Sequence, residues 1–267
     1  MAATQPTFDR AIPQYYDDCL GPAWFDGFAQ DLAARLPSRP PGDVLEIACG
    51  TGILTRHARE RLDPAIRLLA TDLSKAMLDY GRSKLTGTNV EWREADAVKL
   101  PFGDAEFGAV LCAFGVMFVP DRRAAFREAR RVLMPGGMFL FNVWDRIEEN
   151  PHALANAQLF EELFPGDGQI RFNAPFEMHE PALLRSLLGE SGFRETKLEK
   201  KRMYVGGVDA HRLAFGMIRG TPRSALLEKR GANLEDVVER LAQALARAGG
   251  DPYRAQTQAI VVEAQAV

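Results

Sequence analysis

The sequence predicts an α/β protein built on a mostly parallel sheet with helices on both faces, and two observations carry this prediction. Short apolar runs alternate with helix-compatible segments from residue 44 to about residue 143, a rhythm typical of buried parallel strands joined by helices. The first apolar run, 44–48, also leads through the turn Gly50-Thr51-Gly52 directly into a helical segment. Strand, tight turn and helix in this order place a ligand-binding loop at the carboxyl end of the sheet.

The expected elements follow in chain order. Proline and glycine residues between 37 and 42 end an N-terminal amphipathic helix and lead the chain into the first strand. We then expect strands at 44–48, 66–71, 89–93, 108–114 and 137–143, alternating with helices at 53–61, 74–85 and 121–133 and at most one helical turn at 105–107. A helix at 181–191, a strand at 194–204, helices at 210–218 and 233–248 and a last strand at 257–264 complete the pattern.

Composition limits the classes of function. The 267 residues are 46% hydrophobic and 26% charged, and the net charge of −3 lacks the basic surplus that nucleic-acid binding demands. No apolar stretch is long enough to cross a bilayer, and the first residues lack a basic-then-apolar leader. The three cysteines form no Cys-x-x-Cys pair, so neither disulfides nor a metal site is expected. We expect a cytoplasmic protein without membrane insertion and without a nucleic-acid partner.

The glycine loop has the chemistry of a nucleotide site. Gly50 and Gly52 carry no Cβ, so a flat ligand can approach the backbone, and the following helix directs free N–H groups at it. Asp72 stands 20 positions after Gly52 (72 − 52 = 20), where a carboxylate accepts hydrogen bonds from a ribose diol. A dinucleotide fingerprint would need a third glycine where Thr55 stands, so NAD(P) binding is disfavoured.

These residues resemble the class I S-adenosylmethionine-dependent methyltransferases. An acidic residue in the first strand, Glu46, precedes the Gly-x-Gly turn, and Asp72 closes the second strand. Four further runs are similar to the ubiquinone/menaquinone C-methyltransferases of the methyltransferase type 11 subgroup: 94–97, 100–102, 110–121 and 131–137. The resemblance covers about 44–144. It implies a Rossmann-like, seven-stranded, mostly parallel sheet, here with a helical cap inserted after strands 5 and 6.

On this basis we divide the chain into six segments. Two of them, the insertions between core elements, are helical by pattern and are interpreted as a cap that does not fold separately. The segments are N-terminal helices covering the cofactor cleft at 1–43, the cofactor-binding core at 44–144, a cap segment at 145–178, a core helix and strand 6 at 179–205, a helical cap at 206–253, and strand 7 at 254–267.

The resemblance implies S-adenosyl-L-methionine as cofactor and S-adenosyl-L-homocysteine as product. Asp72 would hold the ribose hydroxyls, Asp96 the adenine amino group, and Tyr16 would close over the methionine end. Leu73 and Met77 would flank the adenine, although both also suit a core. The expected cofactor-binding residues are Tyr16, Glu46, Ala48, Cys49, Gly50, Thr51, Gly52, Asp72, Leu73, Met77, Asp96, Ala97 and Phe114, with Ala48 standing where the family often has glycine.

The acidic residues of this set also have structural interpretations. A carboxylate in an apolar strand needs partners, so Glu46 either accepts from backbone N–H groups that brace the loop or binds the cofactor's amino group through water. Asp72 could cap the next helix, although Ser74 can supply that cap. Asp96 could be an ordinary turn residue.

The acceptor side is expected at the apolar wall from Phe114 to Phe118. A hydroxyl or enol acceptor needs a general base, and among the four histidines His179, which enters a helix near the cleft, is the candidate. A lone histidine is more often a structural hydrogen-bonding group. The expected substrate-binding residues are Met117, Phe118, Arg171, which could orient an anionic acceptor, and Phe215 in the cap.

The function predicted on these grounds is methyl transfer from S-adenosylmethionine to a small-molecule acceptor, on oxygen or carbon, by in-line displacement. A quinone-like compound or another secondary metabolite is the expected acceptor, and a monomer and a homodimer are equally consistent with the sequence. Two alternatives stay open. One is a non-enzymatic regulator that binds the cofactor, and the other an NAD(P)-dependent oxidoreductase, which the absence of a Tyr-x-x-x-Lys pair disfavours.

Overall fold

The computed structural model describes residues 11–171 and 173–267, with the side chains of Ala11 and Arg171 left undescribed. The chain divides into two compact units. The first, called the sheet unit below, comprises Asp26–Arg146, Ala174–Met203 and Gln258–Val267. The second, the helical unit, comprises the described part of Met1–Phe25, Ile147–Asn173 and Tyr204–Thr257. This division separates residues before and after Phe25, which the sequence assigns to one N-terminal segment.

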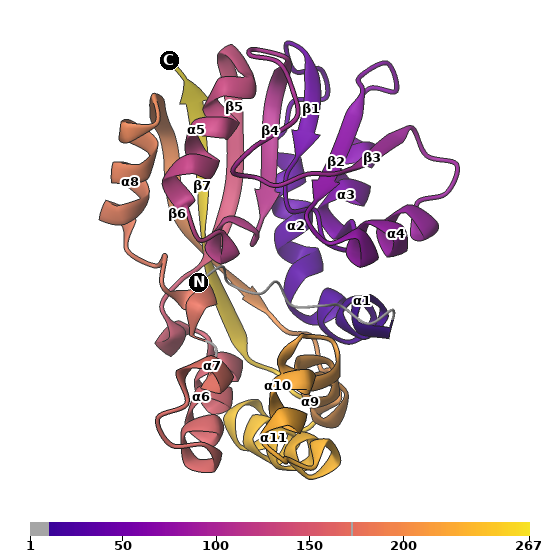
Figure 1. The fold of residues 1–267 in the computed structure, drawn as a ribbon, viewed down its shortest axis with the longest axis vertical. Helices are drawn as coiled ribbons and strands as arrows, with labels where there is room; N and C mark the ends of the chain where they lie inside the picture. The colour runs from indigo at the N-terminus through magenta and orange to yellow at the C-terminus, as the bar shows by residue number, and fades with distance from the viewer. Residues whose placement is uncertain (1–10, 172) are drawn as a thin grey trace. The chain divides into compact units, whose positions relative to one another are not determined.

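The sheet has seven strands in the order β3-β2-β1-β4-β5-β7-β6 (Figure 1). The pairings among β1 to β5 are parallel, and β7 runs antiparallel to β5. This confirms the predicted Rossmann-like, seven-stranded, mostly parallel sheet. The strands are β1 (Asp43–Glu46), β2 (Leu68–Asp72), β3 (Val90–Glu94), β4 (Phe107–Ala113), β5 (Leu133–Trp144), β6 (Phe193–Tyr204) and β7 (Gln256–Ala266).

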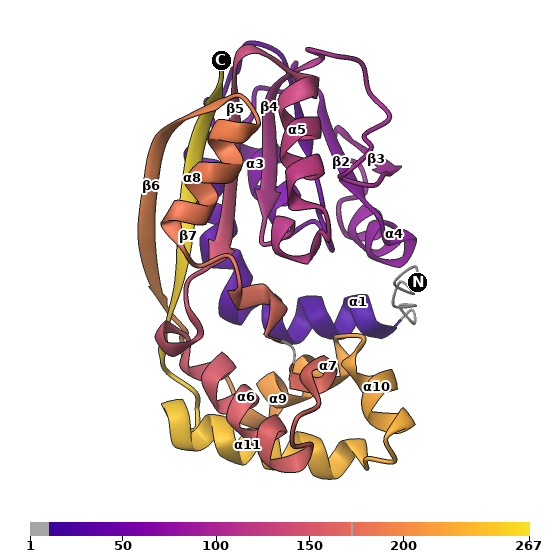
Figure 2. The ribbon, with the colours of Figure 1, turned by 60° about the vertical axis from the view of Figure 1, so that its left-hand side comes forward.

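Helices cover both faces of the sheet, as the sequence predicts. Helices α2 (Asp26–Ala34), α3 (Ile53–Arg61) and α4 (Lys75–Lys84) lie on one face, whereas α5 (Arg122–Val132) and α8 (Pro181–Glu190) lie on the other (Figures 1 and 2). Because side chains alternate along a strand, successive residues of β1 belong to opposite faces. Hence Val44, and with it Glu46, shares the face that α2 and α3 cover.

The two faces have different cores. On one, leucine and alanine side chains of α2 and α3 pack against Val44, Leu68 and Ala109 of the three central strands. On the other, Phe126 of α5 meets Phe139 edge-on, with ring centroids 5.5 Å apart. Every one of these side chains is at most 3% exposed. The sheet is therefore a rigid base for the loops at its carboxyl ends.

Local signals set the ends of the helices beside these loops. Helix α3 begins directly after Gly52, which has a φ of 81°. Ser74 caps α4 by accepting from the Met77 N–H at 3.4 Å, and Asp121 caps α5 by accepting from the Ala124 N–H at 2.9 Å. The helical turn expected at 105–107 is wrong, because Phe107 already pairs in β4.

The helical unit consists of the insertions after β5 and β6 together with the segment before α2. Its longest helix, α11, begins after Asn233, whose side chain accepts from two N–H groups of the first turn, which confirms the predicted cap. Trp24 stacks on His152 with ring centroids 4.2 Å apart. The helices are α1 (Ala11–Tyr15), η1 (Tyr16–Phe25), α6 (Pro151–Leu163), α7 (Gly168–Arg171), α9 (Ala210–Arg219), α10 (Arg223–Lys229) and α11 (Leu234–Gly249).

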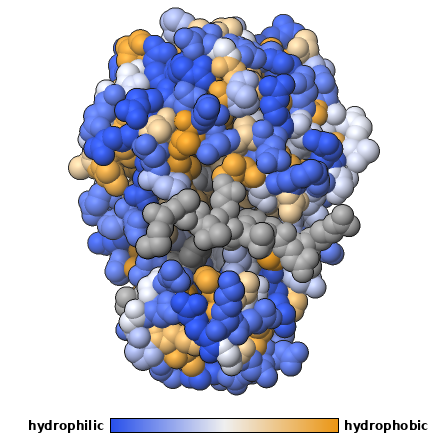
Figure 3. All heavy atoms as spheres, viewed as in Figure 1, coloured by the Kyte–Doolittle hydropathy of each residue, from blue (hydrophilic) through white to orange (hydrophobic). Residues whose placement is uncertain are grey.

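The surface of the sheet unit seen in Figure 3 is mainly hydrophilic, with hydrophobic residues scattered over it. Among the described helices, none combines the length and the apolar character needed to cross a bilayer. Within 11–171 and 173–267, no cluster of histidine, cysteine and acidic side chains is arranged to hold a metal ion.

Candidate functional site

The loop after β1 has an unusual backbone. Ala48, Gly50 and Gly52 all have positive φ values, of 51°, 56° and 81°. A Cβ built on Gly50 would meet no atom within 4 Å, whereas one on Gly52 would lie 2.8 Å from the Trp92 ring. Gly50 therefore leaves an open approach to the backbone, as a flat ligand requires, whereas Gly52 is needed for packing.

Asp72, at the end of β2, connects this loop to the next helix. One carboxylate oxygen accepts from the Gly50 N–H at 2.8 Å, and the other accepts from the Ser74 N–H at 2.8 Å. Burial raises the pKa of Asp72, and these hydrogen bonds partly offset the effect. Each carboxylate oxygen has capacity for a further hydrogen bond, so Asp72 can hold the loop and still accept from a diol.

Glu46 is 1% exposed and has a neutral partner. The Thr55 hydroxyl donates to its carboxylate at 2.6 Å. Burial is the main cause that raises the pKa of Glu46 to about 8, and the nearby Asp72 carboxylate raises it further. This hydroxyl, in the first turn of α3, takes the place of the backbone N–H partners expected from the sequence. The expected contact with a cofactor amino group stays a prediction.

The connection after β3 joins the site through its backbone. The Ala95 N–H donates to the Asp72 carbonyl at 3.0 Å, which places Asp96 beside the end of β2. Asp96 also forms a turn, because its carboxylate accepts from the Val98 N–H at 3.1 Å. Next to Asp72, Leu73 is 43% exposed. A large apolar side chain exposed at this place suits contact with an aromatic ring of a ligand.

Aromatic side chains gather where β4 and β5 end. Phe114 is 5% exposed, stacks on Trp144 at 4.2 Å between ring centroids, and meets Phe28 of α2 edge-on at 5.5 Å. Its φ is 53°, and its N–H is shared by the main-chain oxygen of Asn142 at 3.2 Å and the Asn142 side-chain oxygen at 2.9 Å. A left-handed phenylalanine is strained, and such strain collects at functional sites.

The other residues expected on the acceptor side differ from one another in exposure. Met117 is buried, and its sulfur accepts from the Trp144 N–H at 3.3 Å, whereas Phe118 is 53% exposed. His179 lies just before α8, and both ring nitrogens have partners: Nδ1 lies 2.7 Å from the Phe176 carbonyl and Nε2 lies 3.0 Å from Glu180. A base at this position would have to exchange one of these partners for the acceptor.

Three predicted residues belong to the helical unit. Tyr16 stacks on Phe25 at 5.1 Å between ring centroids, and Phe215 meets Tyr15 edge-on at 4.9 Å. The Arg171 side chain lies outside the described residues. The other predicted residues belong to the sheet unit, where most of them follow the carboxyl ends of β1 to β4 and His179 lies just before α8.

The chemistry of the glycine loop suits S-adenosylmethionine. The Thr51 side-chain oxygen is buried without a hydrogen-bond partner among the described residues, a costly arrangement that a polar ligand group would relieve. The loop also precedes the N-terminus of a nine-residue helix, which favours the cofactor's carboxylate. Burial raises the pKa of Cys112 to about 12 and that of Cys49 well above its usual value. Neither thiol is a nucleophile near neutral pH.

Comparisons with known proteins agree with this geometry. A sequence model described as a methyltransferase domain matches residues 44–137. The chain is 33% identical over 183 residues to the ubiquinone/menaquinone biosynthesis C-methyltransferase UbiE of Pseudomonas savastanoi pv. phaseolicola, over 63% of this chain and 71% of that enzyme. The chain belongs to the class I S-adenosylmethionine-dependent methyltransferases of the UbiE-like type.

Two further comparisons show how far the methyltransferase likeness extends. The UbiE of Hahella chejuensis is 41% identical over 106 residues, which are 38% of this chain and 43% of that protein. The structure of a geranyl diphosphate methyltransferase in complex with GPP and sinefungin has a TM-score of 0.53 and 17% identity, and the match covers 90% of this chain and 77% of that one. At this identity the structural likeness shows the fold alone.

Sequence reasoning missed three residues of this methyltransferase's site. In the sequence, Thr55 indicates only that a glycine is absent from the dinucleotide fingerprint. The signal for its role is Glu46, because a buried carboxylate before the loop requires a hydrogen-bond donor. Asn142 was detectable as the single amide in the apolar run 138–144, and it is fully buried. Trp144 was treated as the end of the core. Its stacking on Phe114 depends on the pairing of β4 with β5, which the sequence does not specify.

Proposed function

We propose that this methyltransferase binds S-adenosylmethionine at the carboxyl ends of β1 to β4. It transfers the methyl group to oxygen or carbon of a small acceptor with a quinone-like ring. The UbiE relatives, named for ubiquinone and menaquinone biosynthesis, support this acceptor class. The aromatic side chains around Phe114 pack on one another, and Phe118, four residues further along, is 53% exposed, so its ring offers a flat apolar surface that suits such an acceptor. A cytoplasmic location and a small-molecule partner are part of the same proposal.

The observation that carries the proposal is the hydrogen bond between Gly50 and Asp72. It holds a carboxylate beside a glycine whose outer side is open. The ribose diol of the cofactor needs a hydrogen-bond acceptor, and the cofactor's carboxylate needs accessible backbone N–H groups nearby. Thr51, with its buried and unpartnered hydroxyl, lies between the two glycines.

The residues of this chain bind the cofactor and orient it. Asp72 would accept from the ribose hydroxyls, Asp96 from the adenine amino group, and Leu73 would cover the adenine ring. When bound, S-adenosylmethionine supplies a methyl group on a sulfonium that is already an activated leaving group. The protein's remaining tasks are to align the acceptor and to keep water away, which the buried ring of Phe114 serves.

The acceptor decides whether a base is needed. A hydroxyl acceptor must lose a proton during transfer, whereas an already ionised phenolate or enolate needs no base. His179 stays the candidate base, and it would first have to release Phe176 or Glu180. Methylation of acceptors with different acidities distinguishes these cases. If His179 is the base, only the weakly acidic acceptors require it.

An acceptor panel tests the proposal. Purified protein would be incubated with S-adenosylmethionine and, separately, a 1,4-naphthoquinol, a phenol and a primary amine, and methylated products measured by mass spectrometry. We expect product from the naphthoquinol, loss of product in Asp72→Asn, and retention in the matched control Asp121→Asn, since Asp121 caps α5 and lies outside the loop. Failure of every acceptor to be methylated, with no S-adenosylhomocysteine formed, would contradict the proposal.

A further inference from the structure

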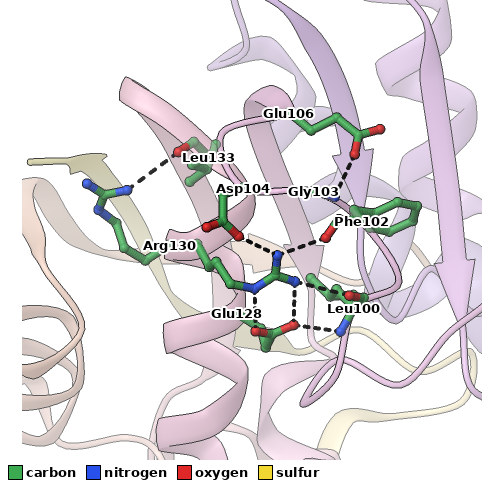
Figure 4. Close-up of polar contacts among 9 residues, drawn as sticks. Leu100, Phe102, Gly103, Asp104, Glu106, Glu128, Arg130 and Leu133 are labelled. Carbon is green, nitrogen blue, oxygen red and sulfur yellow. Dashed lines mark hydrogen bonds and ion pairs between the residues drawn. The ribbon is translucent and has the colours of Figure 1, made fainter.

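The connection between β3 and β4, residues 95–106, is held by the last turn of α5 (Figure 4). The Arg131 guanidinium donates to the main-chain oxygens of Leu100 at 3.0 Å and Phe102 at 2.8 Å. It also donates to the Asp104 carboxylate at 2.8 Å. One side chain thus satisfies two backbone carbonyls of a connection that has no strand or helix of its own to do so.

Glu128 completes this arrangement one turn earlier in α5. Its carboxylate accepts from Arg131 in a bidentate pair, at 2.7 and 2.8 Å, and from the Leu100 N–H at 2.7 Å. The hydrogen bond with Arg131 is the main cause that lowers the pKa of Glu128. Bidentate pairs of this kind fix geometry as well as adding energy. Arg131 and Glu128 are called the α5 clamp below.

The other end of the connection is fixed to β2. The Ala95 N–H donates to the Asp72 carbonyl at 3.0 Å, and the Lys99 N–H donates to the Asp96 carbonyl at 3.0 Å. Asp96 therefore lies in a turn of four residues, immediately followed by Leu100, which the α5 clamp holds at both its N–H and its carbonyl. The position of Leu100 therefore constrains the turn that carries Asp96.

The neighbouring Arg130 provides an internal contrast. Its guanidinium donates to the Gly192 carbonyl at 3.1 Å and to the Leu133 carbonyl at 3.4 Å, and it also contacts the main-chain oxygen of Val267. Each of these partners lies outside 95–106. The two adjacent arginines have the same charge and different partners. Of the two, only the Arg131 side chain contacts the connection among the contacts of the described residues.

We propose that Arg131 and Glu128 are positioning residues that set the selectivity of the cofactor site for adenine, acting through Asp96. Selectivity for an amino group requires an acceptor held at one place, since a carboxylate free to move accommodates a carbonyl oxygen by turning away. The α5 clamp supplies that constraint from outside the site. The inference rests on the proposed binding of S-adenosylmethionine and adds to it the residues that enforce discrimination at the base.

The test compares two ligands that differ on one edge of the base. S-adenosyl-L-homocysteine carries the adenine amino group, and S-inosyl-L-homocysteine carries an oxygen in its place together with a proton on the adjacent ring nitrogen. Dissociation constants for both would be measured by calorimetry on the full chain, for wild type, Arg131→Gln, Glu128→Gln and the control Arg130→Gln. Thermal unfolding of each variant would be recorded, because a loss of stability alone weakens both ligands together and leaves their ratio unchanged.

Wild type should prefer S-adenosylhomocysteine by about ten- to hundredfold, the effect of one hydrogen bond to a charged group. Arg131→Gln should reduce this ratio to about threefold or less, Glu128→Gln should give an intermediate ratio because it still accepts from Leu100, and Arg130→Gln should keep the wild-type ratio within about twofold. If Arg131→Gln does not fold, the ratio in Glu128→Gln decides.

The inference would be overturned by a wild-type protein that binds both ligands equally, or by a folded Arg131→Gln and Glu128→Gln pair with the wild-type ratio. Wild-type protein that binds neither ligand is a different outcome. It contradicts the proposed cofactor itself and with it the selectivity. If Arg130→Gln reduces the ratio of the two dissociation constants as much as Arg131→Gln does, removal of any charge from α5 has this effect. That result would also overturn the role of the α5 clamp.

Discussion

The glycine loop with Asp72 and the aromatic cluster around Phe114 lie on the same edge of one sheet, but they are built in opposite ways. In the loop, backbone N–H groups meet a carboxylate, and residues within 22 positions of one another make the contacts. In the cluster, Phe28, Phe114 and Trp144 come from distant parts of the chain and meet through one stacked and two edge-on ring contacts. Directional hydrogen bonds define the first region, and apolar packing of aromatic rings defines the second.

This difference explains why the sequence predicts the cofactor site better than the acceptor site. Hydrogen bonds at a glycine loop are directional and demand particular residue types at particular spacings, so a motif reports them. Aromatic packing tolerates many combinations of similar volume, so no motif reports it. A family can therefore keep one cofactor while its members change acceptor, and experiments on the two regions should give separable results.

The largest effect should follow from the aromatic cluster. Trp144 is 5% exposed and contacts Phe114, Phe28 and Phe176, so Trp144→Ala should lower the free energy of unfolding by about 3–5 kcal/mol. Leu73→Ala, on the exposed side of the cofactor region, should change it by less than about 0.5 kcal/mol. Urea unfolding followed by circular dichroism measures both. Equal costs for the two substitutions would remove the distinction between the regions.

The two glycines of the loop should separate packing from binding. Gly52→Ala brings a Cβ to 2.8 Å from the Trp92 ring at positive φ, and should cost about 2–3 kcal/mol of stability through overlap and strain. Gly50→Ala meets open space, so its stability cost should be about 1 kcal/mol, the strain alone, whereas its methyl group should obstruct the cofactor. Unfolding and calorimetric titration on both variants test this. The reverse order of stabilities would contradict the assignment of Gly50 to the ligand side.

A separate prediction concerns the dependence of stability on pH. The pKa of Glu46 is raised from 4.5 to about 8 in the folded protein, so the folded state retains a proton that the unfolded state releases. Its contribution is therefore complete below about pH 4.5 and is lost as pH rises towards about 8. Relative to Glu46→Gln, wild type should lose up to about 1.4 kcal/mol per pH unit across this window. Parallel stability curves for the two proteins would show that Glu46 does not titrate there.

The sequence predicts the fold well where local chemistry decides it. Helix α3 lies at the predicted residues 53–61, and the caps at Ser74 and Asn233 form as expected, because each depends on neighbours within three residues. The partner of Glu46 was not predicted, since Thr55 reaches it only when α3 packs on the sheet. The same holds for Arg131. Its sequence run, 131–137, indicates the family, but its contacts with Leu100 and Phe102 are apparent only in the folded structure.

The most direct test of the central claim is calorimetric titration of wild type and Asp72→Ala with S-adenosylmethionine and S-adenosylhomocysteine. Asp72 holds the glycine loop and offers the diol acceptor at once. We predict binding of both ligands to wild type, weakened about ten- to hundredfold by the substitution, or about 1.4–2.8 kcal/mol. Wild-type protein that binds neither ligand, or an Asp72→Ala protein that is folded and binds as well as wild type, would contradict the account.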